Sequence, residues 1–387
     1  MIAVRGSRSA VRGPRSAVVR EALQFPYDPA MSNPANPHRL HRGESPAWVR
    51  YVLSRLVYLF VPLTKLFPRR WPRQVSRSMT KILGRFGDYQ PTEHDVLVCS
   101  YFKSGTNWTL HIAVQIAHRG RAEFEHIHDL VPWPDIPARS RYAVPATDDS
   151  ARLASPTNLR VIKTHIALGG VPYAAKARYI CVVRDPKDVF VSSYHFMRAM
   201  GLGPMMPSVA GWLDAYLSRH TALGSWAEHL DSYWRMRDRD NVLFLTYETM
   251  RTDLPGTVSK IATFMGVALT PAERDAVVAQ TTFAHMKTIG HKFDAQGAPW
   301  TSTKGAMMRR GERGKSNELL SPAEQQRIDD YWRAELHRLG SDFPYDEAFA
   351  LAPKPPADVI GAQPAPAAPP PFADPPDRKT PTLIPTE

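Results

Sequence analysis

Apolar runs alternate with helix-periodic segments along the chain from Asp95 to about Tyr345. Short β-branched and apolar runs predict buried strands over Asp95–Tyr101, Leu159–Lys163, Arg178–Val183 and Val242–Thr246. Apolar residues spaced three or four apart predict helices over Trp108–His118, Pro186–Met200, Trp226–Arg237, Gly256–Met265, Pro271–Thr281 and Ser321–Leu339. Ser321 is expected to cap the last of these helices, because Pro322 and Glu324 complete a helix start signal. This alternation indicates an α/β fold with a central parallel sheet flanked by helices.

Residues 1–44 and 349–387 lack both periodicities. The first stretch repeats AVRGSRS and AVRGPRS, and residues 353–387 contain twelve prolines. Neither stretch can bury enough apolar surface to fold, so we predict disordered extensions. For the N-terminal extension, an organellar transit peptide and a translation start at Met31 remain open. The predicted parts are therefore a disordered extension at 1–44, a basic helical segment at 45–90, a domain at 91–348 and a tail at 349–387.

The net charge of +12 comes entirely from the N-terminal part of the chain. Residues 1–90 hold 16 Lys/Arg against 4 Asp/Glu, whereas residues 91–387 hold 33 of each kind. The predicted domain is therefore neutral, and we expect no nucleic-acid partner for it. Cys99 and Cys181 lie in apolar runs, which indicates core thiols and favours a reducing, cytoplasmic location. No Cys/His group has zinc spacing, so we expect no metal.

The most apolar segment, Trp48–Phe67, mixes aromatic and aliphatic residues with arginines and a lysine. Its uninterrupted apolar run, Leu56–Leu63, is far shorter than the roughly 20 residues that span a bilayer. Pro62 is expected to kink or end the helix. Two interpretations remain: peripheral membrane contact on the cytoplasmic face through residues 45–90, or a helix that packs on the core.

The loop K-S-G-T-N at residues 103–107 links the first predicted strand to the helix after it. Loop N–H groups and the positive end of the helix dipole converge there, which suits a phosphate and makes the domain P-loop-like. The nucleoside-triphosphatase motif G-x-x-x-x-G-K-[ST] is absent, because Lys103 precedes Gly105. The expected anion-binding residues are Lys103, Ser104, Gly105, Thr106, Asn107 and Trp108.

Two further polar groups follow predicted strands. Lys163 and His165 come at the end of the second strand, and Arg184 follows the third. The carboxyl ends of parallel strands form one edge of the sheet, where ligands bind in open α/β folds. Arg184 can hold a phosphate with two parallel hydrogen bonds, and Ser192 on the next helix adds a hydroxyl. We therefore expect a second phosphate site.

These motifs resemble those of one enzyme family. The residues Y-F-K-S-G-T-N-W at 101–108 are similar to Y-P-K-S-G-T-T-W, the 5′-phosphosulfate loop of cytosolic-type sulfotransferases. The K-T-H at 163–165 has its counterpart there. Residues 184–196 are similar to the family's 3′-phosphate motif, R-[DN]-P-x-D-x-x-x-S-x-Y-H-F. The chain thus resembles sulfotransferases that depend on 3′-phosphoadenosine-5′-phosphosulfate (PAPS).

Later segments resemble the family in the same order. They are G-S-W at 224–226, Y-E at 247–248, T-T-F-A-H-M-K at 281–287 and M-R-R-G at 308–311. In the loop that contains M-R-R-G, Ser316 and Asn317 stand where the family usually has Trp and Lys, so the chain departs from the family pattern there. The family's short C-terminal dimer motif is missing, so the oligomeric state stays open.

The resemblance implies a role for each candidate residue. His165 would be the general base, Lys103 would neutralise the leaving oxygen, and Lys163 would hold the sulfonate. Trp108 and Phe283 would stack on the adenine. The remaining donor-binding residues would be Tyr247, Thr281 and Met286 beside the nucleotide, and Arg184, Ser192, Arg309, Arg310 and Gly311 around the 3′-phosphate.

The acceptor is expected to be a hydroxyl or amine of a small, apolar or lipid-like molecule. The segments Glu123–Ser155 and Met197–Leu223 should line its pocket. Their large residues are Phe124, Trp133, Tyr142, Met197, Met200, Met205, Met206 and Trp212. The sequence also leaves two other functional classes open: a kinase that uses the Lys103 loop, and a nucleotide-binding module without catalysis.

Overall fold

The computed structural model describes residues 47–66, 86–136, 142, 144–218, 224–294, 297–298, 300–301 and 316–349. All of these residues belong to one compact unit. The predictions for 1–44, for nearly all of 349–387 and for Arg309, Arg310 and Gly311 lie outside the described residues and remain predictions.

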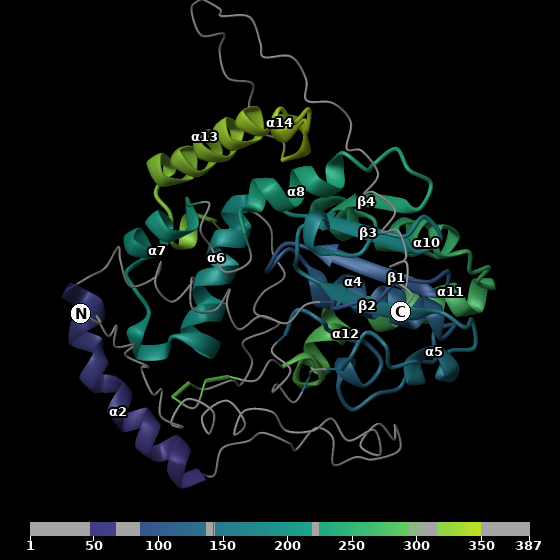
Figure 1. Cartoon of the computed structure of the whole chain (residues 1–387), viewed down its shortest axis with the longest axis horizontal. Coiled ribbons are helices and arrows are strands. Elements are labelled where there is room, and N and C mark those ends of the chain that lie inside the picture. The colour runs from purple at the N-terminus through teal and green to yellow at the C-terminus, as the bar shows by residue number, and fades with distance from the viewer. Residues whose placement is uncertain are drawn as a thin grey trace, which may run out of the picture. The chain divides into compact units, whose positions relative to one another are not determined.

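The centre of the fold is a sheet of four parallel strands in the order β2-β1-β3-β4 (Figure 1). The strands are β1 (Asp95–Ser100), β2 (Arg160–Thr164), β3 (Arg178–Val183) and β4 (Val242–Thr246). All four predicted strands are confirmed, with the ends of the first two shifted by a residue. After β2 the chain crosses β1 to reach β3, so the switch point of the topology lies beside β1, where ligands bind in such sheets.

The buried faces of the strands alternate, as the period of two requires. Val96, Val98 and Val182 point to the face covered by the helices α4 (Thr106–Ala117), α10 (Leu254–Met265) and α11 (Pro271–Thr281). Leu97, Cys99 and Cys181 point to the other face. Cys99 and Cys181 are register partners, and both are free and buried, as expected for core thiols.

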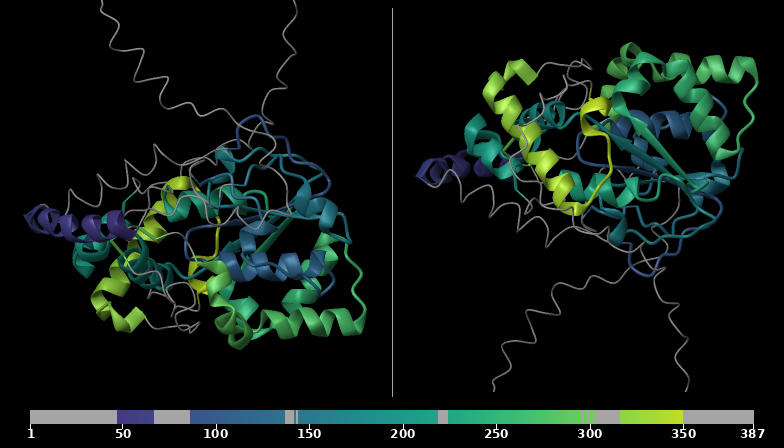
Figure 2. Two further views of the ribbon diagram at one scale, coloured as in Figure 1. Left: turned by 90° about the horizontal axis from the view of Figure 1, so that it is seen from below. Right: turned by 90° about the horizontal axis from the view of Figure 1, so that it is seen from above.

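A second core lies among the helices α6 (Pro186–Phe196), α8 (Trp226–Trp234) and α13 (Pro322–Leu339). The fully buried Trp226 and Trp332 are its largest side chains, and α13 packs against both other helices (Figures 1 and 2). Ser321 and Glu324 form the predicted capping box at the start of α13. The helix predicted over Pro186–Met200 is α-helical only to Phe196, after which Met197–Gly201 forms the π-helical η6.

Shorter elements complete the described chain. The α-helices are α5 (Ser150–Ala154), α7 (Val209–Tyr216), α9 (Tyr247–Thr252), α12 (Phe283–Thr288) and α14 (Tyr345–Ala348). The 3₁₀ turns are η4 (Ile127–Asp129), η5 (Leu168–Gly170), η7 (Gly203–Met205), η8 (Gly290–Phe293) and η9 (Ser316–Glu318). The sequence pattern did not predict these pieces, because each is too short to show a period.

The N-terminal helix α2 (Ala47–Leu66) contains Pro62, which was expected to kink or end it. The helix does not end there but continues to Leu66, and a kink at Pro62 stays a prediction. Pro62 lies four residues before the end of the helix at Leu66. The hydrogen bond that it cannot donate is therefore lost close to the end of the helix and not in its middle. No helix among the described residues is long and apolar enough to cross a membrane.

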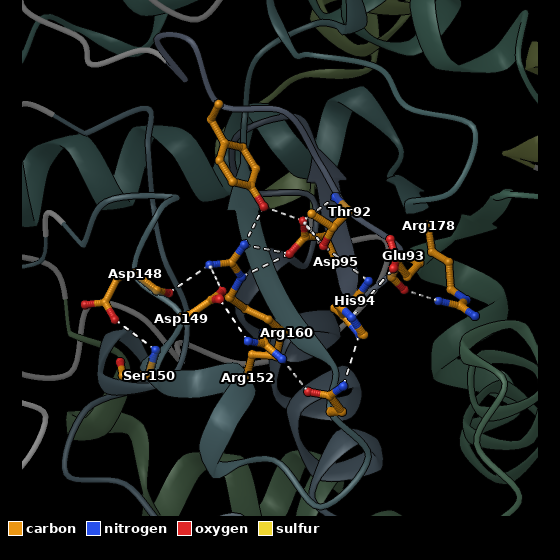
Figure 3. A network of polar contacts seen from close by, with 12 residues as sticks. Thr92, Glu93, His94, Asp95, Asp148, Asp149, Ser150, Arg152, Arg160 and Arg178 are labelled. Carbon is orange, nitrogen blue, oxygen red and sulfur yellow. Dashed lines mark hydrogen bonds and ion pairs between the residues drawn. The ribbon is translucent and has the colours of Figure 1, made fainter.

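A buried ion pair joins β1 and β2 at their amino ends (Figure 3). The Arg160 guanidinium donates to Asp95 Oδ1 at 3.0 and 2.8 Å and to the Asp148 carbonyl at 2.8 Å. It also contacts Asp149 Oδ1 at 3.1 Å and the Tyr89 hydroxyl. Every nitrogen of this guanidinium therefore has an acceptor from the protein itself.

Candidate active site

The loop after β1 has an unusual backbone that Gly105 makes possible. Lys103 and Gly105 have positive φ angles of 67° and 98°, and Gly105 is the N-cap of α4. A Cβ at Gly105 would lie 2.7 Å from the ring of Tyr247, so only glycine fits there. The loop is thus held tightly around the N-terminus of α4, the geometry that suits an anion.

The hydroxyl groups of this loop differ in what they bind. Thr106 Oγ1 lies 2.7 Å from Ser100 Oγ, and this hydrogen bond joins the helix start to the strand end. Ser104 Oγ is buried and has no hydrogen-bond partner among the described atoms. A buried hydroxyl without a partner costs free energy unless something satisfies it, so Ser104 is poised for a ligand.

Lys103 lies among aromatic rings and another cation. Its Nζ is 4.4 Å from the centre of the Phe196 ring and 6.0 Å from that of Phe102. Burial and the charge of Arg184 lower the pKa of Lys103 to about 7. None of the described carboxylates forms an ion pair with it, so an incoming anion would meet an uncompensated ammonium.

Lys163, which is buried, lies near the same edge. Its Nζ sits 3.3 Å from the centre of the Trp133 ring. Burial is the main cause that lowers the pKa of Lys163 to about 7; Asp135 opposes this shift, and Lys103 adds to it. Lys103 therefore affects the pKa of Lys163 across the space between β1 and β2, which are neighbours in the sheet.

His165 is fixed in one tautomer. Its Nδ1–H donates to the carbonyl of Ser100 at 2.8 Å, which leaves Nε2 as the acceptor in the neutral ring. The rings of Phe102 and Trp133 pack edge-on against it at 6.2 and 5.8 Å. Burial, followed by the charge of Lys163, lowers the pKa of His165 to about 3, well below its ordinary value. The ring is thus neutral at pH 7, with a lone pair on Nε2.

Asp135 positions this histidine, and the sequence did not single it out. The buried carboxylate accepts from the His165 backbone N–H and, at 3.0 Å, from Thr164 Oγ1. Burial raises the pKa of Asp135 to about 6. Its only sequence signal was a lone acid among apolar residues, between Trp133 and Ile136.

Arg184 connects the third strand to the loop. Its Nη1 donates to the Lys103 carbonyl at 3.3 Å, and its guanidinium lies 4.3 Å from the centre of the Tyr247 ring. Nη2 contacts Asp188 Oδ2 at 3.4 Å. Nε is buried without a partner, so one donor of the fork remains for a ligand.

The other predicted donor-binding residues lie around this centre to different degrees. Trp108 packs edge-on against Tyr247 at 5.5 Å, and its Nε1–H donates to the Thr281 carbonyl at 2.7 Å. Phe283 is exposed, and its ring makes no contact with that of Trp108. The predicted stacking of both rings on the adenine therefore stays a prediction. Met286 is buried on the side of the sheet that α4, α10 and α11 cover. Asn107 and Ser192 are partly exposed on α4 and α6.

Among the large residues predicted to line an acceptor pocket, Trp133 contacts both Lys163 and His165. Trp212 turns into the second core instead, where its Nε1–H donates to Ser193 Oγ at 3.1 Å. Met200 and Met205 are buried as well. Of these residues, Trp133 therefore lies beside the lysine and histidine of the candidate site, and the acceptor pocket itself stays a prediction.

Residues 93–340 match the family described as "Sulfotransferase domain", which is well over half of the chain. The chain belongs to the sulfotransferase family. Sulfotransferase 1C2 of Oryctolagus cuniculus is 27% identical over 274 residues, which are 67% of this chain and 89% of that protein. Sulfotransferase 2A6 of Mus musculus is 32% identical over 201 residues, which are 50% of this chain and 67% of that protein.

Solved structures agree with this fold. A retinol dehydratase in complex with androsterone and the inactive cofactor PAP aligns with a TM-score of 0.55 at 20% identity, over 71% of this chain and 88% of that one. A mouse sulfotransferase complexed with PAP gives a TM-score of 0.51 at 23% identity, over 71% and 90%. The expected fold class and the expected enzyme class, EC 2.8.2, are confirmed for this sulfotransferase.

Proposed function

We propose that this sulfotransferase moves a sulfuryl group from PAPS to a hydroxyl or amine of a small, apolar or lipid-like acceptor. One observation carries the proposal: two lysines without ion-pair partners among the described residues, Lys163 buried and Lys103 half-buried, lie beside a neutral histidine of fixed tautomer. That set can hold an anionic donor and accept a proton at one place. Relatives of the same fold were solved with PAP, which supports this donor.

In this proposal the loop and its neighbours bind the donor. Lys103, the Ser104 hydroxyl and the N-terminus of α4 hold the 5′-phosphosulfate, because they offer a cation, an unused donor and the helix dipole at one point. Arg184 and Ser192 hold the 3′-phosphate. The adenine lies near Trp108, Tyr247, Thr281, Phe283 and Met286. Arg309, Arg310 and Gly311, outside the described residues, keep their predicted role at the 3′-phosphate.

His165 takes the acceptor proton on Nε2. The new bond forms between sulfur and the acceptor oxygen, while the bond from sulfur to the bridging phosphate oxygen breaks and its electron pair leaves with the bisphosphate. Lys103 neutralises the charge that grows on the leaving oxygen, and Lys163 holds the sulfonate. A bound anion beside these lysines offsets their charge, so we expect the pKa of His165 to rise from about 3 in the complex.

The acceptor class rests on the walls around His165. Phe102 and Trp133 pack against the ring from two separate loops, so a group that approaches Nε2 meets aromatic surface. Such walls favour a phenol, sterol-like or long-chain alcohol over a sugar. A retinol dehydratase of this fold was solved with retinol and with androsterone, both apolar alcohols, which supports the same class. The cytoplasmic location remains a prediction.

The test is a transfer assay with the full-length protein. PAPS, or ATP with magnesium, is offered with a panel of phenols, sterols, alkyl alcohols, amines and sugars, and products are identified by mass. We expect the mass of one sulfuryl group to be added to apolar acceptors from PAPS only. Transfer from ATP would identify a kinase instead. Binding of PAPS without transfer to any acceptor would identify a nucleotide-binding module.

A further inference from the structure

The helix α2 has one packed side. Val57 is only 4% exposed, and α2 lies against η7, the turn Gly203–Met205. Trp48 precedes Val57 by nine residues, which is about two and a half helical turns, so the two side chains project from opposite sides of the helix. The side that carries Trp48 therefore faces away from η7.

This outward side is apolar, where a helix on a soluble protein normally carries polar residues. Trp48 and Leu59 are each 70% exposed. The exposed large apolar residues of α2 are Trp48, Tyr51, Val52, Leu56, Tyr58 and Leu59, which we call the α2 outer face. In the described part of the chain, only Leu153 and Phe283 are exposed in the same way elsewhere, each on a different helix. Contiguous exposed apolar surface of this kind marks an interaction site.

Charge decides which occupant fits the α2 outer face. The helix contains no acidic residue, and Arg50, Arg55 and Lys65 are its ionisable cations. The Arg55 guanidinium lies 5.2 Å from the centre of the exposed Tyr51 ring, so a cation sits within the apolar surface itself. Six more basic residues follow in the sequence between Leu66 and Phe86. Tyr and Trp beside Arg on an amphipathic helix suit the boundary of an anionic bilayer.

The packed side of α2 contacts a segment that continues to a residue of the candidate active site. The turn η7 follows η6, which continues α6 from Phe196, and the Phe196 ring contacts Lys103. The α2 outer face is therefore attached, through one continuous segment, to the residues beside the reacting centre. That segment is also part of the stretch in which the sequence places acceptor recognition.

We propose that the α2 outer face lies in the surface of an anionic lipid bilayer and brings the active site to acceptors dissolved there. The lipid contact stands on the exposed residues and charges of α2 alone. The part that concerns acceptors rests on the proposed sulfotransferase function. Two separate measurements therefore test the two parts.

The first measurement is co-sedimentation of the full-length protein with vesicles, without donor or acceptor. Vesicles are made of phosphatidylcholine alone or mixed with phosphatidylglycerol. The double variant Trp48→Ser/Leu59→Ser should bind the mixed vesicles about tenfold or more weakly, because it removes two large apolar groups from the interface. The matched control is Leu153→Ser, since Leu153 is 72% exposed on α5; it should bind as the wild type does.

The lipid proposal gains support if the wild type prefers mixed vesicles and if about 1 M salt weakens the binding. It is overturned if the wild type does not sediment, or if the double variant binds as well as the control. It is equally overturned if light scattering shows that the wild type self-associates through this face and the double variant does not. Thermal unfolding should be unchanged in the double variant, because both side chains are exposed.

The second measurement compares turnover on a vesicle-dissolved sterol with turnover on a water-soluble phenol. The double variant should lose about tenfold in kcat/KM for the sterol in mixed vesicles and keep its rate with the phenol. Equal rates on both acceptors for wild type and variant would reject the acceptor part and leave lipid binding intact. Absence of transfer to either acceptor would instead reject the proposed function.

Discussion

Cations at the two ends of the sheet differ in whether the protein supplies their hydrogen-bond and ion-pair partners. At the amino end, the Arg160 side chain is 2% exposed, and every nitrogen of its guanidinium meets an oxygen of Asp95, Asp148, Asp149 or Tyr89 (Figure 3). At the carboxyl end, Lys103 and Lys163 form no ion pair with a described residue, and their pKa values are lowered to about 7. Nearby, Arg184 Nε and Ser104 Oγ have no partner.

This contrast distinguishes a cation that stabilises the fold from cations that are candidates for ligand binding. A buried charge is tolerated when fixed groups of opposite charge surround it, as at Arg160. Leaving buried cations without such groups costs stability, which makes them candidates for binding something that the protein itself does not supply. Both ends lie on the same strands, so the difference comes from the neighbours and not from the strands.

The largest effect is expected at the carboxyl end. His165→Ala should lower turnover by about 10²–10⁴-fold, because Nε2 would no longer take the acceptor proton. Binding of the bisphosphate product, measured by calorimetry, should change little. The control is His118→Ala at the far end of α4, which should keep its turnover. Near-normal turnover of the His165 variant would remove this residue as the base.

The second prediction uses two residues of the same strand. Arg160→Leu should lower the free energy of unfolding by about 3–5 kcal/mol, because it leaves Asp95 buried without its counterion. Lys163→Met should keep or raise the unfolding free energy, because it removes a cation whose burial is unfavourable. Urea unfolding at pH 7 measures both. Equal losses in the two variants would show that the two ends do not differ as described.

Third, Arg184→Ala should weaken 3′-phosphorylated nucleotides by roughly 10–100-fold, since it removes charge-assisted hydrogen bonds to that phosphate. Nucleotides without the 3′-phosphate should bind as weakly to the variant as to the wild type. Arg239→Ala is the matched control, because Arg239 also lies over a tyrosine, 4.9 Å from the ring of Tyr173. If the wild type binds nucleotides with and without the 3′-phosphate equally, the assignment of Arg184 fails.

The smallest effect concerns pH. The pKa of Lys103 and that of Lys163 are about 7 in the free protein, so both lose their charge as the pH rises above 7. The protonated fraction of each lysine falls about fivefold between pH 7 and pH 8, so kcat/KM for the donor should fall at least on the order of fivefold over that range. In the variant Lys103→Arg this decrease in kcat/KM should occur at higher pH, because arginine stays charged. A flat profile in the wild type would mean that the lysines keep their protons.

The same two groups affect stability in a defined direction. In the unfolded chain lysine has its ordinary pKa near 10.4, above the folded value of about 7. The unfolded state therefore binds more protons between these values, and the stability of the fold should decrease as the pH falls from about 10 to about 7. Lys163→Met should reduce this dependence, which urea midpoints at pH 7 and pH 9 would show.

Much of the fold could be predicted from local pattern. All four strands and the N-cap at Ser321 follow from apolar runs and capping chemistry, which depend on residues close in sequence. The continuation of α2 beyond Pro62 and the π-helical turn after Phe196 could not be predicted, because the spacing of apolar residues does not report the hydrogen-bond pattern within a helix. The order of the motifs along the chain is enough to indicate the enzyme family without any contact between them.

The sequence by itself determined which side chains could do chemistry and in which order they follow the strands. Only the tertiary structure decided their state. The tautomer of His165 depends on the Ser100 carbonyl, 65 residues away in the chain, and its backbone is held by Asp135. The lowered pKa values of Lys103 and Lys163 come from burial and from cations on other elements. Such properties depend on distance through space and on exclusion of water, which no local pattern encodes.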